Sequence, residues 1–220
     1  CVGMFLLGGV FWAQFGMASV YGARADLSLA EITTFVAAFY VGALVLQYPL
    51  GWFSDRMDRR VLIMIVAVTG AGGAIAGMLF GLSFPILLVS AFVIGGMSNP
   101  LYSLLIAHAN DFLQHEDMAA ASGGLLFING LGAIAGPLVM GWLMGPQVVG
   151  PSGFFLFIGC IMVSLAGYAA YRSTKRGAVP VEDTGAYAAV SPTLGAVAME
   201  VAQEISIEAD LESESAEPAA

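Results

Sequence analysis

The stretch GWFSDRMDRRVLI, residues 51–63, is the first indication of the architecture, because it is a tight cluster of charge between stretches that carry none. Its charged residues are Asp55, Arg56, Asp58, Arg59 and Arg60. Residues 32–54 before the cluster and residues 61–107 after it contain no Asp, Glu, Lys or Arg. A charged turn between two uncharged runs is typical of two membrane-spanning helices joined at the bilayer surface.

The composition of the whole chain also indicates contact with lipid. Of its 220 residues, 59% are hydrophobic and only 10% are charged, and the mean hydropathy is +0.86. Soluble globular domains carry about 25% charged residues. A deficit of this size predicts a membrane protein with the lipid bilayer as its surroundings.

The uncharged runs predict the number of membrane crossings, each of which needs about 20 apolar residues. The runs cover residues 1–23, 32–54, 61–107 and 118–171, and the third and fourth are divided by GLSFP (81–85) and GPQVVGPSG (145–153). Backbone groups in lipid must pair within their own segment, so the crossings are helices. We therefore predict an all-α membrane protein whose six helices span about 1–23, 31–53, 61–81, 85–107, 118–144 and 152–171.

The first residue and the cysteines bear on processing and cofactors. Cys1 opens the chain inside an apolar run with no basic segment before it, which is unlike a signal peptide. We expect a fragment that starts within a transmembrane helix. Cys1 and Cys160 give no reason to propose a disulfide or metal framework, and no cofactor is expected.

The basic residues predict the orientation in the membrane. Three of them follow the second predicted helix and three follow the sixth, while Arg24 stands alone at the opposite side. The two groups are Arg56, Arg59, Arg60 and Arg172, Lys175, Arg176. The positive-inside rule then predicts a multi-pass protein of the cell membrane, plasma or inner, with a cytoplasmic C-terminus.

Residues 177–220 differ from the rest in composition. They are rich in Ala, Glu, Ser and Pro and contain nine of the 16 acidic residues but no Lys or Arg. Residues 1–176 balance seven acidic against seven basic residues, so the segment 177–220 carries the whole of the net charge of −9. Such a composition predicts a disordered acidic tail on the cytoplasmic side.

The charge cluster has two interpretations. The arginines could serve only as topology anchors, but that does not explain Asp55 and Asp58. Alternatively, a carboxylate beyond a helix end pairs with arginines and with the positive N-terminus of a neighbouring helix.

Residues Gly51, Asp55, Arg56, Arg59 and Arg60 fit the pattern G-x-x-x-D-R-x-x-R-[KR]. This pattern resembles the signature between the second and third helices of each half in the major facilitator superfamily (MFS) of secondary transporters. Asp58 stands where that signature usually has a second glycine.

A second stretch supports the resemblance. GLGAIAGPLVMG, residues 130–141, is similar to the glycine–proline motif on the fifth helix of a half. Gly132 and Gly136 permit close backbone approach, and Pro137 weakens the hydrogen-bond ladder and allows the helix to bend.

The resemblance implies that residues 1–176 are one half of a twelve-helix fold, and the acidic tail makes it the C-terminal half. Its main partner would be the missing N-terminal six-helix half. The two halves would move a small-molecule substrate by alternating access. The cluster of Gly51, Asp55, Arg56, Arg59 and Arg60 would then act as a cytoplasmic latch that closes the inner gate.

Polar side chains at membrane depth are the candidates for the substrate cavity, because they are costly there. They are Gln14, Gln47, Asn99, Tyr102 and Asn129. In the superfamily the first and fourth helices of a half line the cavity, which favours Trp12, Gln14, Phe15, Asn99 and Tyr102. The alternative for each polar residue is a hydrogen bond between helices, worth about 0.6 kcal/mol.

The sequence is compatible with two modes of transport and with one rival function. The predicted spans hold no charged side chain. If protons are the coupling ion, their binding site would therefore lie in the missing half or use His108. Facilitated diffusion without a coupling ion is the alternative. The main rival is a non-transporting scaffold or sensor that uses its acidic tail. An enzyme is not expected, since HANDFLQHED (108–117) lacks the zinc pattern H-E-x-x-H and reads as a solvated connection. We expect no metal and no nucleic-acid partner.

Overall fold

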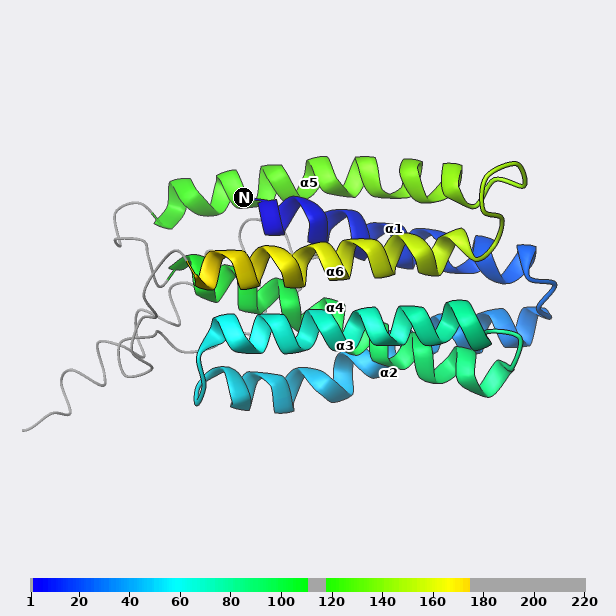
Figure 1. Cartoon of the computed structure of the whole chain (residues 1–220), viewed down its shortest axis with the longest axis horizontal. Helices are drawn as coiled ribbons and strands as arrows, with labels where there is room; N and C mark the ends of the chain where they lie inside the picture. Colours follow the sequence, from blue (N-terminus) through cyan, green and yellow to red (C-terminus); the bar gives the residue numbers. More distant parts are fainter. Residues whose placement is uncertain (1, 111–117, 175–220) are drawn as a thin grey trace, which may run out of the picture.

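The computed structural model describes residues 2–110 and 118–174, so the predicted tail (177–220) and most of the connection at 108–117 lie outside it. Within the described ranges the chain forms six α-helices and no strand (Figure 1). They are α1 (Val2–Arg24), α2 (Leu29–Ser54), α3 (Arg59–Phe80), α4 (Phe84–Asn110), α5 (Met118–Leu143) and α6 (Gly153–Ser173). Each is long and apolar enough to cross a membrane. The predicted all-α membrane fold is confirmed.

The side chains of Ser28 and Glu31 define where α2 begins. The Ser28 hydroxyl accepts a hydrogen bond from the Glu31 N–H at 3.3 Å, and the Glu31 carboxylate accepts one from the Ser28 N–H at 2.8 Å. This capping box satisfies two N–H groups that a helix N-terminus would otherwise leave unpaired. The helix therefore begins at Leu29, before its charged residue.

The turn between α2 and α3 is also held by local hydrogen bonds. The Asp55 N–H donates to the Gly51 carbonyl at 3.2 Å, and the Asp58 carboxylate accepts from the Arg60 N–H at 2.9 Å. Asp58 has φ −55°, a backbone conformation that any residue adopts. Here a carboxylate N-cap takes the place of the second glycine of the superfamily signature.

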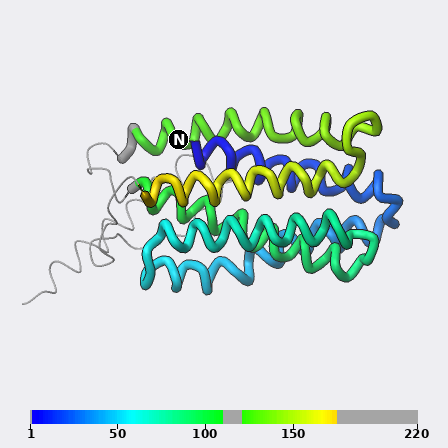
Figure 2. The backbone as a smooth tube through the Cα atoms, viewed as in Figure 1, coloured from blue at the N-terminus to red at the C-terminus, as the bar shows by residue number. Residues whose placement is uncertain are grey.

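The helices pack mainly on partners that are distant in sequence. The most extensive contacts join α2 to α4, α1 to α5, and α3 to both α4 and α6. Exchanging α1–α3 for α4–α6 converts the α1–α5 contact into the similarly extensive α4–α2 contact, a relation that inverted three-helix repeats produce. The α3–α4 contact, in contrast, is more extensive than its counterpart between α6 and α1. Figure 2 shows α1, in dark blue, running beside α5, in green.

Glycines allow the two closest crossings. A Cβ at Gly132 of α5 would overlap the carbonyl oxygen of Phe5 in α1, and one at Gly136 would overlap that of Gly9. In the same way, a Cβ at Gly42 of α2 would overlap the carbonyl oxygen of Phe92 in α4. Without a hydrophobic driving force in lipid, such close approach supplies the van der Waals contact that holds membrane helices together.

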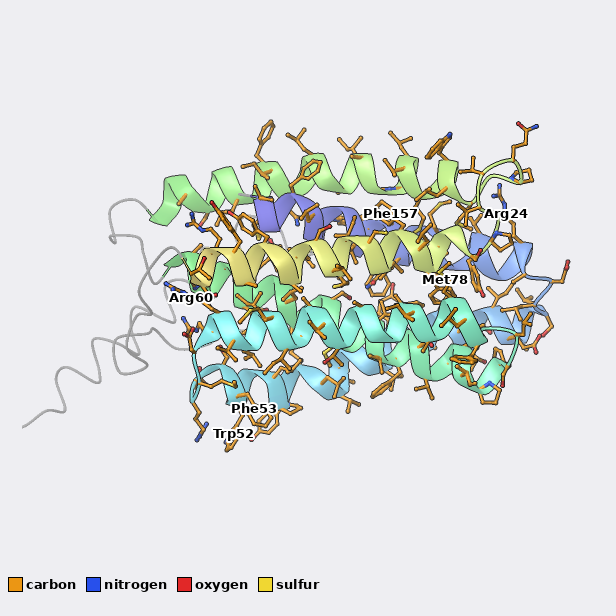
Figure 3. All side chains as sticks on the ribbon, in the orientation of Figure 1. Arg24, Trp52, Phe53, Arg60, Met78 and Phe157 are labelled. Carbon is orange, nitrogen blue, oxygen red and sulfur yellow. The ribbon has the colours of Figure 1, made fainter. Side chains whose placement is uncertain are left out.

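The bundle has two distinct ends, which Figure 3 marks by Arg24 and Arg60. The connections α1–α2, α3–α4 and α5–α6 lie at the Arg24 end; the α2–α3 turn and the last turn of α6 lie at the Arg60 end (Figure 1). At the Arg24 end, the Arg24 guanidinium donates to the Met144 carbonyl at 2.6 Å and joins the end of α1 to the residue that follows α5.

The core at the Arg24 end is aromatic. Rings from α1, α2 and α6 pack edge to face or tilted, with neighbouring centroids 5.1 to 6.3 Å apart. They belong to Tyr21, Phe35, Phe39, Phe154 and Phe155, all of which are buried. Such contacts add to the packing of this end, so the two ends differ: one is an aromatic core and the other carries the charged turn.

Candidate functional site

A polar contact joins α1 and α4 inside the bundle. Gln14, near the middle of α1, is fully buried, and its amide nitrogen donates to the Ser98 hydroxyl at 2.7 Å. The Gln14 Oε1 atom is also buried, and it accepts no hydrogen bond within the described part of the chain. One half of this amide therefore fastens two helices, and the other half is an acceptor at membrane depth.

Asn99 adds a second acceptor beside this contact. Its side chain is only partly buried, but its Oδ1 atom is enclosed and has no hydrogen-bond partner among residues 2–110 and 118–174. Pro100 follows, and because proline has no N–H, the Gly96 carbonyl lacks its usual intrahelical donor. The sequence SNP at 98–100 thus concentrates acceptor oxygens on α4.

Aromatic rings flank Gln14 on α1. Trp12 is 39% exposed, and the half-buried Phe15 packs on Tyr40 of α2 with centroids 4.6 Å apart. Phe11, which is buried, touches both Trp12 and Phe15. This cluster presents ring faces and edges beside the buried amide.

The other predicted cavity residues lie in different surroundings. Tyr102 is fully enclosed, whereas Asn99, three positions earlier, is partly exposed. Asn129 is buried at the α1–α5 crossing, where its amide nitrogen donates to the Met4 carbonyl at 3.2 Å. Gln47 is half-buried on α2. The structure thus brings Gln14 to the Ser98–Asn99 segment and uses Asn129 to fasten α1 to α5.

Sequence reasoning missed two residues of this region, Ser98 and Tyr40. Ser98 could have been found from its place before Asn99 and Pro100, where two adjacent polar residues interrupt an apolar run. Tyr40 had no such signal, since a tyrosine within a membrane helix is ordinary.

The charge cluster divides into an outward pair and an inward pair. Asp55 and Arg56 are exposed, and the Arg56 guanidinium lies 4.2 Å from the centre of the Trp52 ring and donates to the Trp52 carbonyl at 3.2 Å. Arg59 and Arg60 are buried, with 3% and 7% of their surface exposed. The Arg59 Nε atom donates to the Ser54 hydroxyl at 3.3 Å. Within the described part of the chain, the outward pair is thus exposed at the surface, whereas the inward pair is enclosed by the bundle.

A six-helix bundle, a polar contact between α1 and α4 and a charged turn at one end are the features that the resemblance to the major facilitator superfamily leads us to expect. Comparison with known proteins identifies the family: the model of the Major Facilitator Superfamily matches residues 1–204, and the chain belongs to this superfamily. The family predicted from the turn at 51–60 and the glycine–proline stretch is confirmed, and six helices fit one half of its fold.

Curated relatives are MFS-type transporters that are much longer than this chain. The uncharacterized MFS-type transporter YfkF of Bacillus subtilis (strain 168) is 29% identical over 153 residues, which cover 68% of this chain and 38% of YfkF. The uncharacterized MFS-type transporter YcaD of Escherichia coli O139:H28 is 24% identical over 142 residues, 64% of this chain and 36% of YcaD. The chain is therefore a multi-pass membrane protein of a transporter family. Its match covers well under half of the length of these relatives.

Solved structures show the same fold. The POT family transporter PepTSo aligns with a TM-score of 0.67 at 16% identity, over 81% of this chain and 38% of that one. The human organic anion transporter MFSD10 aligns with a TM-score of 0.54 at 18% identity, over 88% of this chain and 49% of that one. At such identities the likeness concerns the fold alone.

Proposed function

We propose that this chain is the C-terminal half of a transporter that moves a small solute by alternating access, with α1 and α4 lining the pathway. The observation that carries the proposal is the pair of enclosed acceptors, Gln14 Oε1 and Asn99 Oδ1, which have no donor in the described part of the chain. A buried acceptor without a donor is costly. Hydroxyl, amide or amine hydrogens of a solute would satisfy both atoms.

The exposed side of α1 supports a partner other than lipid. This helix contacts α2, α4, α5 and α6, and one stripe along it stays exposed. The stripe holds Phe5, Trp12, Gly16, Ser19 and Ala23. Three of these are small. The exposed side of α3 also holds Thr69 and Gly72, but most of it is bulky, namely Val61, Ile65, Val68, Ile75, Met78, Leu79 and Phe80. Small residues favour close helix contact in membranes, so we assign the α1 stripe to the N-terminal half and the α3 side to lipid.

The outward pair of the charge cluster fits a contact that forms and breaks during transport. Asp55 and Arg56 are exposed at the Arg60 end, which the positive-inside rule assigns to the cytoplasm together with the C-terminus. Carboxylate and guanidinium groups at a surface pair weakly, which suits a latch that must open. We propose that these two side chains meet the N-terminal half when the transporter faces outward.

Any proton-coupled step would use groups outside the middle of these helices. Between their first and last turns the described helices contain no Asp, Glu, Lys or Arg. We therefore place a coupling carboxylate, if transport is proton-driven, in the N-terminal half, and facilitated diffusion is the alternative mechanism.

The test is an uptake screen with the full-length protein in proteoliposomes, covering sugars, amino acids, short peptides, organic anions and amines. For a solute that is transported, Asn99→Leu and Gln14→Leu should each reduce uptake at least tenfold. Losing the Gln14–Ser98 bond costs the fold only about 0.6 kcal/mol, so the purified variant should remain folded. The matched control is Ser164→Ala on α6, whose hydroxyl bonds only the preceding turn at Cys160. Uptake by both leucine variants at the wild-type rate would refute the assignment of the pathway.

A further inference from the structure

Three helices meet in one layer near the middle of the bundle. The Gln14 amide bonds α1 to α4 there, and the ring contact between Phe15 and Tyr40 joins α1 to α2. The helices α2 and α4 cross close by, where a Cβ at Gly95 would overlap the Phe39 carbonyl oxygen. Gln14 and Tyr40 each lie near the middle of their helices. Side chains of α1, α2 and α4 therefore come together at membrane depth.

The hydrogen bonds of Ser98 fix the orientation of the Gln14 amide. The Ser98 hydroxyl donates its one hydrogen to the Gly95 carbonyl at 3.4 Å. It can therefore only accept from Gln14, whose nitrogen lies 2.7 Å away. The Gln14 Oε1 atom must then point away from Ser98, which leaves an acceptor rather than a donor in the layer.

The enclosed side-chain atoms of this layer that lack a partner are both acceptors. Within residues 2–110 and 118–174 they are Gln14 Oε1 and Asn99 Oδ1, whereas the unpartnered Ser90 hydroxyl lies two turns away on α4. An ammonium group donates hydrogen bonds and accepts none. A sugar hydroxyl does both, so acceptors without matching donors suit an ammonium group better than a polyol.

Aromatic rings lie beside these acceptors. Phe15 follows Gln14 on α1, and its ring centroid lies 4.6 Å from that of Tyr40. Phe11 contacts both Phe15 and Trp12, at 4.7 and 5.9 Å. Trp12 and Tyr40 are exposed within the described part of the chain. An aromatic face attracts a cation that lies within about 6 Å of its centre, so the rings favour a positively charged group.

The same layer offers nothing that attracts an anion. Between their first and last turns the described helices contain no Asp, Glu, Lys or Arg. An anion that entered here would lose its hydration, find no positive partner in this half and face amide oxygens. A cation instead gains both the oxygens and the ring faces.

We propose that the transported solute is a protonated organic amine with an aromatic body. Gln14 Oε1 and Asn99 Oδ1 accept hydrogen bonds from its ammonium group, and the rings of Trp12, Phe15 and Tyr40 surround its charge. Both oxygens are enclosed, so their side chains turn toward the solute as it binds. The inference rests on the proposed transport function and names its substrate class.

The test measures binding of four probes to the full-length protein in detergent by isothermal titration calorimetry. The probes share a phenyl ring on a short chain and differ in the head group. They are phenethylammonium, phenethyl alcohol, phenylpropionate and phenethyltrimethylammonium, which keeps the charge but has no N–H. We expect phenethylammonium to bind about tenfold tighter than the alcohol and the carboxylate.

Variants separate the acceptors from the rings. Asn99→Leu and Gln14→Leu should each weaken phenethylammonium binding about tenfold, the order expected for one lost charge-assisted hydrogen bond. Both should leave phenethyltrimethylammonium binding unchanged, which also shows that the variants are folded. Tyr40→Leu should weaken binding of both cations about fivefold. The matched control is Tyr168→Leu, an exposed tyrosine on α6, which should change neither.

The outcomes distinguish the substrate class from transport itself. Binding of the alcohol or the carboxylate as tightly as phenethylammonium would overturn the inference. So would an equal loss of both cations in Asn99→Leu, because the oxygen would then not be a ligand. If no probe binds, the inference fails, but proteoliposome uptake of another class of solute would leave the proposed function standing. Uptake of no solute at all would refute the proposed function.

Discussion

Replacing Gly132 by alanine should destabilise the bundle, because the new methyl would meet backbone atoms of α1. A Cβ at this position overlaps the Phe5 carbonyl oxygen and lies 2.9 Å from the Gly9 nitrogen and 3.0 Å from the Phe5 carbonyl carbon. Backbone atoms inside a helix cannot rotate away, so α1 and α5 must separate along their crossing. Overpacking of this kind costs about 1–3 kcal/mol.

The matched control is Gly130→Ala on the same helix, where a Cβ meets nothing within 4 Å. Both variants gain the same helix propensity, about 1 kcal/mol for Gly→Ala, so the difference between them isolates the steric cost. We expect the free energy of unfolding, measured by SDS titration with circular dichroism, to be about 1–3 kcal/mol lower for Gly132→Ala than for Gly130→Ala. A difference below about 0.5 kcal/mol, within the usual range for harmless substitutions, would refute the close crossing.

Two further predictions concern the charged turn and the acidic tail. Asp55→Asn should slow uptake by weakening the latch while leaving the unfolding free energy within about 0.5 kcal/mol of wild type. Asp26→Asn is the control, because Asp26 is an exposed acid in the connection at the Arg24 end. Its backbone has φ 55°, which asparagine also tolerates. Equal uptake by Asp55→Asn and wild type would exclude the latch. Deleting residues 177–220 should leave uptake unchanged, whereas abolished function would favour the scaffold alternative.

The fold was predictable because each membrane crossing requires a run of about 20 apolar residues, which can be counted in the sequence. Uncharged runs mark the crossings, and the glycine and proline clusters at 81–85 and 145–153 mark the turns inside the two longest runs. Local chemistry at the helix ends was less visible. The second helix was predicted to begin at about residue 31, whereas α2 begins at Leu29, because Ser28 is the N-cap and Glu31 completes the capping box from inside the helix.

The site was predictable only in part, because spacing along one helix does not reveal what each face meets. Gln14 and Asn99 were found from polarity alone. Ser98 was not, since a serine can bond its own helix and its partner appears only when α1 crosses α4. Asn99 and Tyr102 have the spacing of one helix face, yet α4 is so surrounded that Tyr102 is fully enclosed.

The charge cluster shows why one motif can serve two purposes. Asp55 and Arg56 follow the end of α2, whereas Arg59 and Arg60 belong to the first turn of α3, and Asp58 separates the pairs as the N-cap. The inward arginines therefore move with α3 as part of a rigid helix. We expect rocking of the two halves to break contacts of Asp55 and Arg56 while the surroundings of Arg59 and Arg60 stay intact. Removing charge from the outward pair should then change transport while the free energy of unfolding stays within about 0.5 kcal/mol of wild type.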